Sequence, residues 1–155
     1  MQSGPCLYVD ADACPVKAEV SKVAERHGLA VTYVANAWMQ TPRGPRFRLQ
    51  VVTGAFDAAD DWIVAQVAPV DVVITADIPL ASRCLKKGAR VLGPSGKPFT
   101  DDNIGNALAT RELMADLRAY GVGGGPPPFG PRDRSRFLEA LELVVRDAKL
   151  QSANG

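Results

Sequence analysis

The order of apolar segments along the chain is the feature that most constrains its fold. Five short apolar stretches alternate with longer segments in which apolar residues recur at helical spacing. Short runs of this kind predict buried strands, here at residues 6–9, 30–35, 49–53, 70–75 and 90–92. Alternating strands and helices are typical of an α/β fold, so we expect a three-layer α/β/α domain with a mainly parallel sheet.

The predicted helices have recognisable first and last residues. Pro15 suits the first turn of one helix and Gly28 its end, and further helices are predicted at 57–67, 79–87 and 102–120. The segments 38–48 and 121–132 are rich in Pro with Arg or Gly, which predicts surface loops. We therefore expect a single domain over residues 1–155, with 121–132 as a Gly/Pro-rich loop and 133–149 as an amphipathic C-terminal helix.

Composition excludes several classes of protein. A chain of 155 residues with 46% hydrophobic residues can bury a core without disulfides. A net charge of +1 argues against a surface that binds nucleic acid by overall charge. Three cysteines without paired metal-ligand spacing, and the lack of a leader, predict reduced thiols and a cytoplasmic location. The apolar runs are too short to span a membrane, so no membrane association is expected.

Aspartates follow the predicted strands. Because parallel strands joined by right-handed crossovers end at one edge of a sheet, acids that follow different strands are expected to meet there. The first turn of the helix at 57–67 faces the same edge. The acids concerned are Asp10, Asp12, Asp57, Asp60, Asp61, Asp77, Asp101 and Asp102.

Converging carboxylates need a cation. Two like charges 4 Å apart repel by roughly 4 kcal/mol at an effective dielectric of about 20, and a shared divalent ion relieves this repulsion. All-oxygen ligation suits Mg²⁺ or Mn²⁺, and such sites perform phosphoryl chemistry. The expected metal ligands are Asp10, Asp12, Asp60 and Asp77, with Asp101 and Asp102 as further candidates. The first four, together with Lys17, are the candidate catalytic residues.

Helix capping is the alternative explanation for each acid. It explains Asp57, Asp61, Asp101 and Asp133 well, because all four lie near predicted helix starts. In contrast, Asp10, Asp12 and Asp77 end strands, and Asp60 shares a helical stripe with core residues. A metal role is therefore expected mainly for this second group.

Other polar residues near the expected edge are candidates for substrate binding: Asn36, Thr75, Asn103 and Arg111. The two asparagines lie where turn or cap roles explain them equally well. Arg111 lies on the apolar side of its helix and is expected to pair with a carboxylate or to hold a phosphate. Lys17 either reaches a phosphate or only compensates nearby charge. Cys14 and His27 are expected to be structural, because no Cys–His pair is predicted.

Several long motifs point to a known family. The strings YVDADACPVK, GAFDAADDWI, VVITADIPLA, FTDDNIGNALATREL and GGPPPFGPRDRSRF resemble the YaiI/YqxD family of uncharacterised bacterial proteins over nearly the whole chain. That family is similar to PIN-like domains, which implies a PIN-like, Rossmann-like fold and a ribonuclease dependent on Mg²⁺ or Mn²⁺.

The resemblance also implies residue roles. Asp10 looks like the first-strand acid, Asp60 like the helix acid and Asp77 like the strand-end acid, while Asp101 or Asp102 looks like the fourth. Asp12 and the segment 14–17 depart from the usual PIN-like pattern.

The predicted function is a divalent-metal-dependent ribonuclease or phosphodiesterase with RNA as its partner. One alternative is a haloacid-dehalogenase-like phosphatase with Asp10 as nucleophile and with Thr75, Lys86 or Lys87, and Asp101–Asp102 in the other roles. The insertion that usually follows the acid pair of such enzymes is missing here. The other alternative is a non-catalytic RNA-binding or adaptor domain, whose binding residues are Arg43, Arg46, Arg48, Lys86, Lys87 and Lys97.

Overall fold

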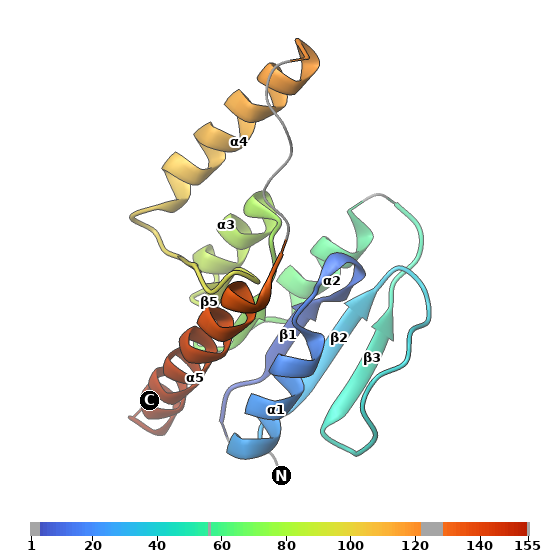
Figure 1. Ribbon diagram of the computed structural model, residues 1–155. Helices are drawn as coiled ribbons and strands as arrows, with labels where there is room; N and C mark the ends of the chain where they lie inside the picture. The colour runs from blue at the N-terminus through green and yellow to red at the C-terminus, as the bar shows by residue number, and fades with distance from the viewer. Residues whose placement is uncertain (1–3, 56, 122–128, 155) are drawn as a thin grey trace.

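A single six-stranded sheet forms the middle layer of the protein (Figure 1). The computed structural model describes residues 4–55, 57–121 and 129–154. The strands lie in the order β3-β2-β1-β4-β5-β6, and all neighbours are parallel except β5 and β6. Their bounds are β1 (Leu7–Asp10), β2 (Val31–Ala35), β3 (Phe47–Val51), β4 (Val72–Ile74), β5 (Arg90–Leu92) and β6 (Pro98–Phe99). The predicted mainly parallel α/β sheet is confirmed.

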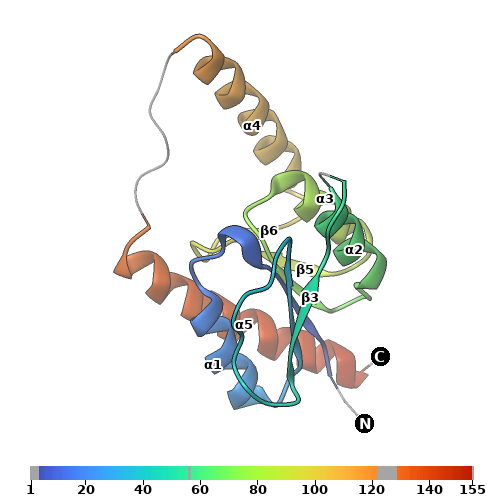
Figure 2. The same ribbon diagram turned by 90° about the vertical axis from the view of Figure 1, so that its right-hand side faces the viewer.

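Helices cover both faces of the sheet. Figures 1 and 2 show α1 and α5 on one face and α2 and α3 on the other, while α4 projects away from the body of the protein. A short 3₁₀ turn, η1 (Ala11–Ala13), follows β1 directly. The helix bounds are α1 (Lys17–His27), α2 (Ala58–Gln66), α3 (Ile78–Lys86), α4 (Ile104–Ala119) and α5 (Pro131–Asn154). The arrangement is the expected three-layer α/β/α architecture.

The sheet separates two apolar cores. In β4, the outer residues Val72 and Ile74 belong to the core under α1 and α5, and Val73 belongs to the core under α2 and α3. Because side chains alternate across a strand, a strand that is buried on both faces must be apolar at every position. This requirement explains the continuous apolar runs of the sequence.

The chain reverses its direction of travel across the sheet at β1. It first moves from β1 to β2 and β3, and then returns to place β4 on the other side of β1. The connections that leave β1 and β4 therefore diverge, which opens a crevice at the carboxyl ends of these two strands. Asp10 ends β1, and Thr75 and Asp77 follow β4, so all three lie at this crevice.

Element boundaries differ from the expectations in places. The third strand begins at Phe47 rather than at 49, so the predicted loop 38–48 is shorter. The last helix begins at Pro131 and ends at Asn154, and the backbone N–H of Gly130 donates to Asp133 Oδ2 at its start. Of the predicted loop 121–132, residues 122–128 lie outside the described residues, and 131–132 are helical.

The short strand β6 was not predicted. It pairs antiparallel with β5 through a turn in which Gly93 N–H donates to the carbonyl oxygen of Lys97 over 2.9 Å. Because it runs antiparallel, β6 returns the chain to the amino ends of the parallel strands, beside the start of β5. Across the described ranges, none of the helices has the combination of length and apolar character needed to cross a bilayer.

Candidate functional site

A hollow of about 330 Å³, here called the acid pocket, lies at the crevice between β1 and β4. Three separated segments contribute four carboxylates to it, from the end of β1, the first turn of α2 and the end of β4. These are four of the predicted site residues, brought together by the β-α order. The pocket is lined by Asp10, Asp12, Cys14, Asn36, Ala59, Asp60, Ala76, Asp77 and Pro94.

Asp10 is held by the neighbouring strand. The Thr75 hydroxyl donates to Asp10 Oδ2 over 2.8 Å and accepts a hydrogen bond from the backbone N–H of Asp77. Burial raises the pKa of the Asp10 carboxyl, the Thr75 hydrogen bond opposes this, and the charges of Asp77 and Asp12 raise it further. Thr75, which is only 2% exposed, thus lies behind the pocket and positions its acids.

Asp77 both follows a strand and begins a helix. Its Oδ1 accepts from the backbone N–H of Leu80 over 2.9 Å, which makes Asp77 the N-cap of α3. The expectation that Asp77 does not start a helix is wrong, because residues 75–77 are the whole connection between β4 and α3 and the last of them caps the helix. A cap of this kind uses one carboxylate oxygen, so the other is available to the pocket.

Asp12 joins the ends of β1 and β2. Both of its carboxylate oxygens accept from the backbone N–H of Asn36, at 3.1 and 3.0 Å. Asn36 also lines the pocket, as expected for a residue that ends the second strand. The pair braces the rim of the pocket, and the exposed Asp12 carboxylate keeps its second set of lone pairs for other partners.

Asp60 shows how strongly the acids influence one another. Burial, followed by the charges of Asp77, Asp10 and Asp57, raises the pKa of Asp60 to about 6, with Arg83 opposing. Arg83 forms its ion pair with the adjacent Asp61 instead, at 2.8 Å. Asp61 is therefore a surface residue paired with a cation, whereas Asp60 belongs to the acid pocket.

The donor set fits a partly hydrated divalent ion. In the described ranges, no three acidic, cysteine or histidine side chains lie close enough together to ligate one ion directly. Mg²⁺ commonly takes only one or two protein carboxylates and keeps several waters, so it does not need three. Asp10 and Asp77, on neighbouring segments, would hold such an ion, with Asp12 and Asp60 acting through its water.

Asp101 and Asp102 are not brought to the acid pocket. Because β6 runs antiparallel to β5, Asp101 lies beside the start of β5, in a separate hollow that Arg90 also lines. The expectation that they join the other acids assumed that the chain stayed at the carboxyl edge after β5. The unpredicted antiparallel strand β6 instead returns the chain to the opposite edge of the sheet.

Lys17 is directed into the turn rather than over the acids. Its Nζ donates to the carbonyl oxygens of Ala11 and Cys14, at 3.4 and 3.0 Å. It therefore stabilises η1, the turn that carries Asp12.

Asn103 and Arg111 line a different hollow beside α4. The amide of Asn103 is already occupied, since Nδ2 donates to the carbonyl oxygen of Pro98 and Oδ1 accepts from Thr100 N–H, both over 2.9 Å. Asn103 thus has the turn and cap role that the sequence left open.

Besides Ala59 and Ala76, two lining residues were not predicted for the site, Cys14 and Pro94. Cys14 was expected to be structural; it is a buried residue, 6% exposed, that lines the acid pocket, and burial raises the pKa of its thiol. Its position four residues after Asp10 was the available signal. Pro94 comes from the turn between β5 and β6, which had no signal in the sequence because the hairpin was not predicted.

The comparisons with known proteins point to one family. The sequence profile of the uncharacterised YaiI/YqxD family matches residues 8–147. A UPF0178 protein of Rhodopseudomonas palustris (strain BisB5) is 57% identical over 141 residues, which cover 90% of this chain and 86% of the relative. A UPF0178 protein of Paramagnetospirillum magneticum is 58% identical over 144 residues, 92% of this chain and 95% of the relative. No solved structure matches the chain. The long motifs, the profile and these relatives agree, and the chain belongs to the YaiI/YqxD family.

Proposed function

We propose that the protein is a divalent-metal-dependent phosphodiesterase that cleaves RNA, with the acid pocket as its active site. One observation carries the proposal: four carboxylates from three chain segments line the pocket, and no lysine, arginine or histidine among the described residues lines it with them. Uncompensated carboxylates at the switch point of a parallel sheet favour a cation bound together with an anionic substrate.

The residues of the acid pocket have different roles in the proposed reaction. When bound, the metal ion supplies charge neutralisation for the phosphate and lowers the pKa of water. Asp10 and Asp77 would hold the ion, and Thr75 keeps Asp10 in place through its hydroxyl. Asp60, which lines the pocket from the first turn of α2, is the carboxylate left to accept a proton from the attacking water.

The choice of RNA rests on resemblance. The YaiI/YqxD family is similar to PIN-like domains, in which acids on the first strand, on a helix and at a later strand end serve ribonucleases. The acid pocket combines Asp10, Asp60 and Asp77 in that pattern.

The phosphatase alternative has less support. It needs Lys86 or Lys87 beside the nucleophile, but both lie at the far end of α3, whose first turn is at the pocket. Nine helical residues at 1.5 Å each separate the two ends by about 13 Å. The phosphatase alternative also needs Asp101 and Asp102 at the nucleophile. They follow β6 at the amino ends of the parallel strands, opposite to the acid pocket.

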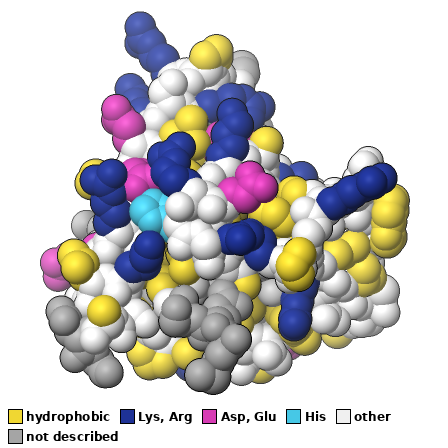
Figure 3. Space-filling view, turned by 90° about the horizontal axis from the view of Figure 1, so that it is seen from below, with side chains coloured by type: hydrophobic (Ala, Val, Ile, Leu, Met, Phe, Trp, Pro, Cys, Tyr) yellow, Lys and Arg dark blue, Asp and Glu magenta, His cyan; other side chains and the backbone are white. Residues whose placement is uncertain are grey.

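The adaptor alternative needs a concentrated basic surface. Figure 3 shows the face at the amino ends of the strands, where Lys and Arg side chains are scattered among acidic and apolar ones. Such a mixture favours solvation over a dedicated nucleic-acid surface.

The test is cleavage of labelled single-stranded RNA with Mn²⁺, for wild type, Asp10→Asn and Asp77→Asn. Asp61→Asn is the matched control, because its carboxylate pairs with Arg83 at the surface. We expect metal-dependent cleavage by wild type and by the control, abolished by EDTA. Each site variant should lose more than about 100-fold, since even residues behind a metal ligand contribute up to that factor.

Two results would contradict the proposal. One is wild type that binds RNA without cleaving it, which favours the adaptor. The other is unchanged cleavage by both site variants.

A further inference from the structure

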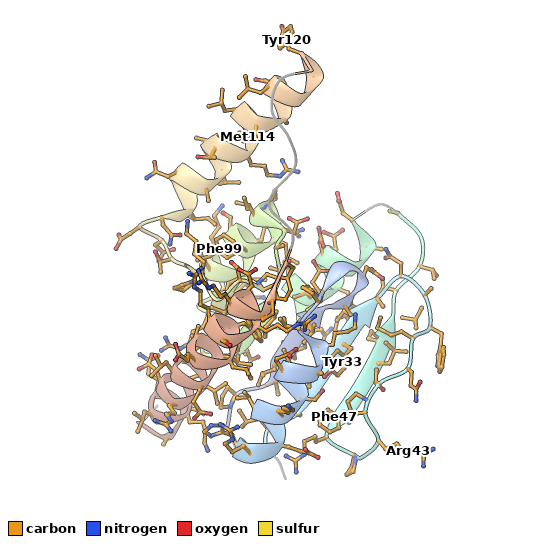
Figure 4. The ribbon with its side chains drawn as sticks, in the orientation of Figure 1. Tyr33, Arg43, Phe47, Phe99, Met114 and Tyr120 are labelled. Carbon is orange, nitrogen blue, oxygen red and sulfur yellow. The ribbon has the colours of Figure 1, made fainter. Side chains whose placement is uncertain are left out.

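A second hollow of about 580 Å³, here called the α4 groove, lies beside the acid pocket. It is formed by α4, the start of α3 and the β5–β6 hairpin. Figure 4 labels two of its apolar residues, Phe99 near the hairpin and Met114 on α4. The groove is lined by Ile78, Lys97, Phe99, Asn103, Asn106, Ala107, Thr110, Arg111 and Met114.

The two hollows adjoin along two chain segments. Asp77 lines the acid pocket, and the next residue, Ile78, lines the α4 groove. On the hairpin, Pro94 lines the pocket and Lys97, three residues later, lines the groove. A flexible polymer bound at the pocket therefore reaches the groove without crossing the body of the protein.

The charges of the two hollows are opposite. The acid pocket has four carboxylates, whereas the α4 groove has two cations, Lys97 and Arg111, and no carboxylate. Within the described part of the chain, neither cation takes part in an ion pair. Lys97 also borders another hollow, which Glu139 and Arg136 line with it. Within the α4 groove itself, two cations without a carboxylate are suited to bind phosphate, and a guanidinium can do so with two hydrogen bonds.

The hairpin that carries Lys97 is fixed on both sides. Asn103 ties it to the start of α4 through its bond to the carbonyl oxygen of Pro98. On the other side, a side chain added at Gly96, whose φ is +90°, would come within 2.7 Å of the carbonyl oxygen of Arg136 on α5. This close packing holds the hairpin in one place, so little ordering is needed when a ligand binds.

We propose that the α4 groove binds the sugar–phosphate backbone of the RNA strand that the acid pocket cleaves, with Lys97 and Arg111 contacting phosphates that flank the scissile one. The proposal rests on the proposed function for the identity of the polymer. It adds a direction to the substrate path, from the pocket along α4, and it makes the preferred substrate a strand rather than a single nucleotide.

The test is RNA binding by an inactive parent, Asp10→Asn with Asp77→Asn, measured by fluorescence anisotropy of a labelled single-stranded oligonucleotide. Lys97→Ala and Arg111→Ala are added singly and together. Arg43→Ala is the control, because Figure 4 shows Arg43 at the far end of the β2–β3 loop, away from α4. Thermal melting verifies that every variant is folded.

We expect each groove substitution to weaken binding about 10-fold, the size of one charge-assisted hydrogen bond. Together they should reduce the slope of log affinity against log salt by about 1.4, which is two phosphate contacts on a single strand. Arg43→Ala should bind like the parent. Unchanged affinity and slope in the double variant would overturn the inference, as would a parent that binds no RNA.

The outcome is separable from that of the proposed function. If Asp77→Asn abolishes cleavage but the groove variants bind RNA normally, the proposed active site stands and the proposed role of the α4 groove is wrong. If the groove variants lose RNA binding but Asp10→Asn still cleaves fully, RNA binding in the groove stands and the proposed active site is wrong.

Discussion

The Thr75 hydroxyl lies 2.8 Å from Asp10 Oδ2 and links the two central strands where their connections diverge. The Thr75 hydroxyl oxygen also accepts a hydrogen bond from the backbone N–H of Asp77. One buried hydroxyl therefore sets the positions of two acids that are 67 residues apart in the chain. Among the described residues, this hydroxyl is the one hydrogen-bonding group that joins the acid of β1 to the acid that follows β4.

Replacing Thr75 tests this link. Thr75→Val removes the donor but keeps the shape, so we expect a loss of stability of about 1–3 kcal/mol in urea unfolding. Mn²⁺ affinity, measured by thermal shift, should fall about 10- to 100-fold, as for other residues that orient metal ligands. Thr75→Ser keeps the hydroxyl and should restore most of the affinity. Equal Mn²⁺ affinity in Val and Ser variants would contradict this role.

Asp60 should reduce stability at neutral pH. Its folded pKa, about 6, lies above its usual value of 3.8, so the charged form is disfavoured by folding. The penalty is complete above the folded pKa and disappears as pH falls below the usual value.

Asp60→Asn should thus stabilise the metal-free protein by about 1 kcal/mol at about pH 7.5, after allowance for partial exposure, and by almost nothing at about pH 3. In melting curves this is a rise of roughly 2–4 °C. A gain of the same size at both pH values would show that the charge is not the cause.

Asp71 provides a contrast among the acids. It is only 8% exposed, and its oxygens accept from the backbone N–H groups of Cys6 and Ala68, each over 2.9 Å. Asp71→Ala removes two hydrogen bonds to a buried carboxylate and should cost about 1–3 kcal/mol in chemical unfolding. The Mn²⁺-induced rise in melting temperature should persist in this variant. Its disappearance would mean that metal binding is not confined to the acid pocket.

Gly96 should not tolerate a side chain. A Cβ there would meet the Arg136 carbonyl oxygen at 2.7 Å, and the positive φ is unfavourable for other residues. Gly96→Ala should therefore destabilise the fold by about 1–3 kcal/mol, the usual cost of overpacking, in urea unfolding. Gly105→Ala, where nothing lies within 4 Å, is the control and should not destabilise the fold, because alanine is the better helix former in α4. Equal stability of the two variants would argue against close packing of the hairpin on α5.

Much of the fold could be predicted because local sequence patterns determine the strands and the helix ends. Strands buried on both faces must be apolar throughout, and Gly28 ends α1 as expected, although α1 begins at Lys17 and leaves Pro15 in the turn before it. The convergence of Asp10, Asp60 and Asp77 followed from the β-α order alone, since parallel strands share one carboxyl edge.

The rest depended on tertiary structure. Strand β6 has only two residues, one of them proline, so it has no periodic pattern, and without it the reversal that carries Asp101 away from the pocket could not be foreseen. The use of Lys17 was equally hidden, because side-chain hydrogen bonds to backbone carbonyls depend on turns that the sequence does not specify. For Asn103 the sequence left the observed turn and cap role open beside substrate binding. Cys14 was predicted to be structural because no histidine partner was expected, so its place in the pocket lining was not foreseen.

The central claim is that the acid pocket holds a divalent ion. Anomalous diffraction from crystals soaked in Mn²⁺ locates the metal directly and needs neither substrate nor turnover. We expect an anomalous peak about 2.1 Å from carboxylate oxygens of Asp10 and Asp77, with water completing the coordination, and no such peak in crystals of Asp10→Asn. An ordered pocket without a peak at saturating Mn²⁺, or a peak elsewhere only, would contradict the account.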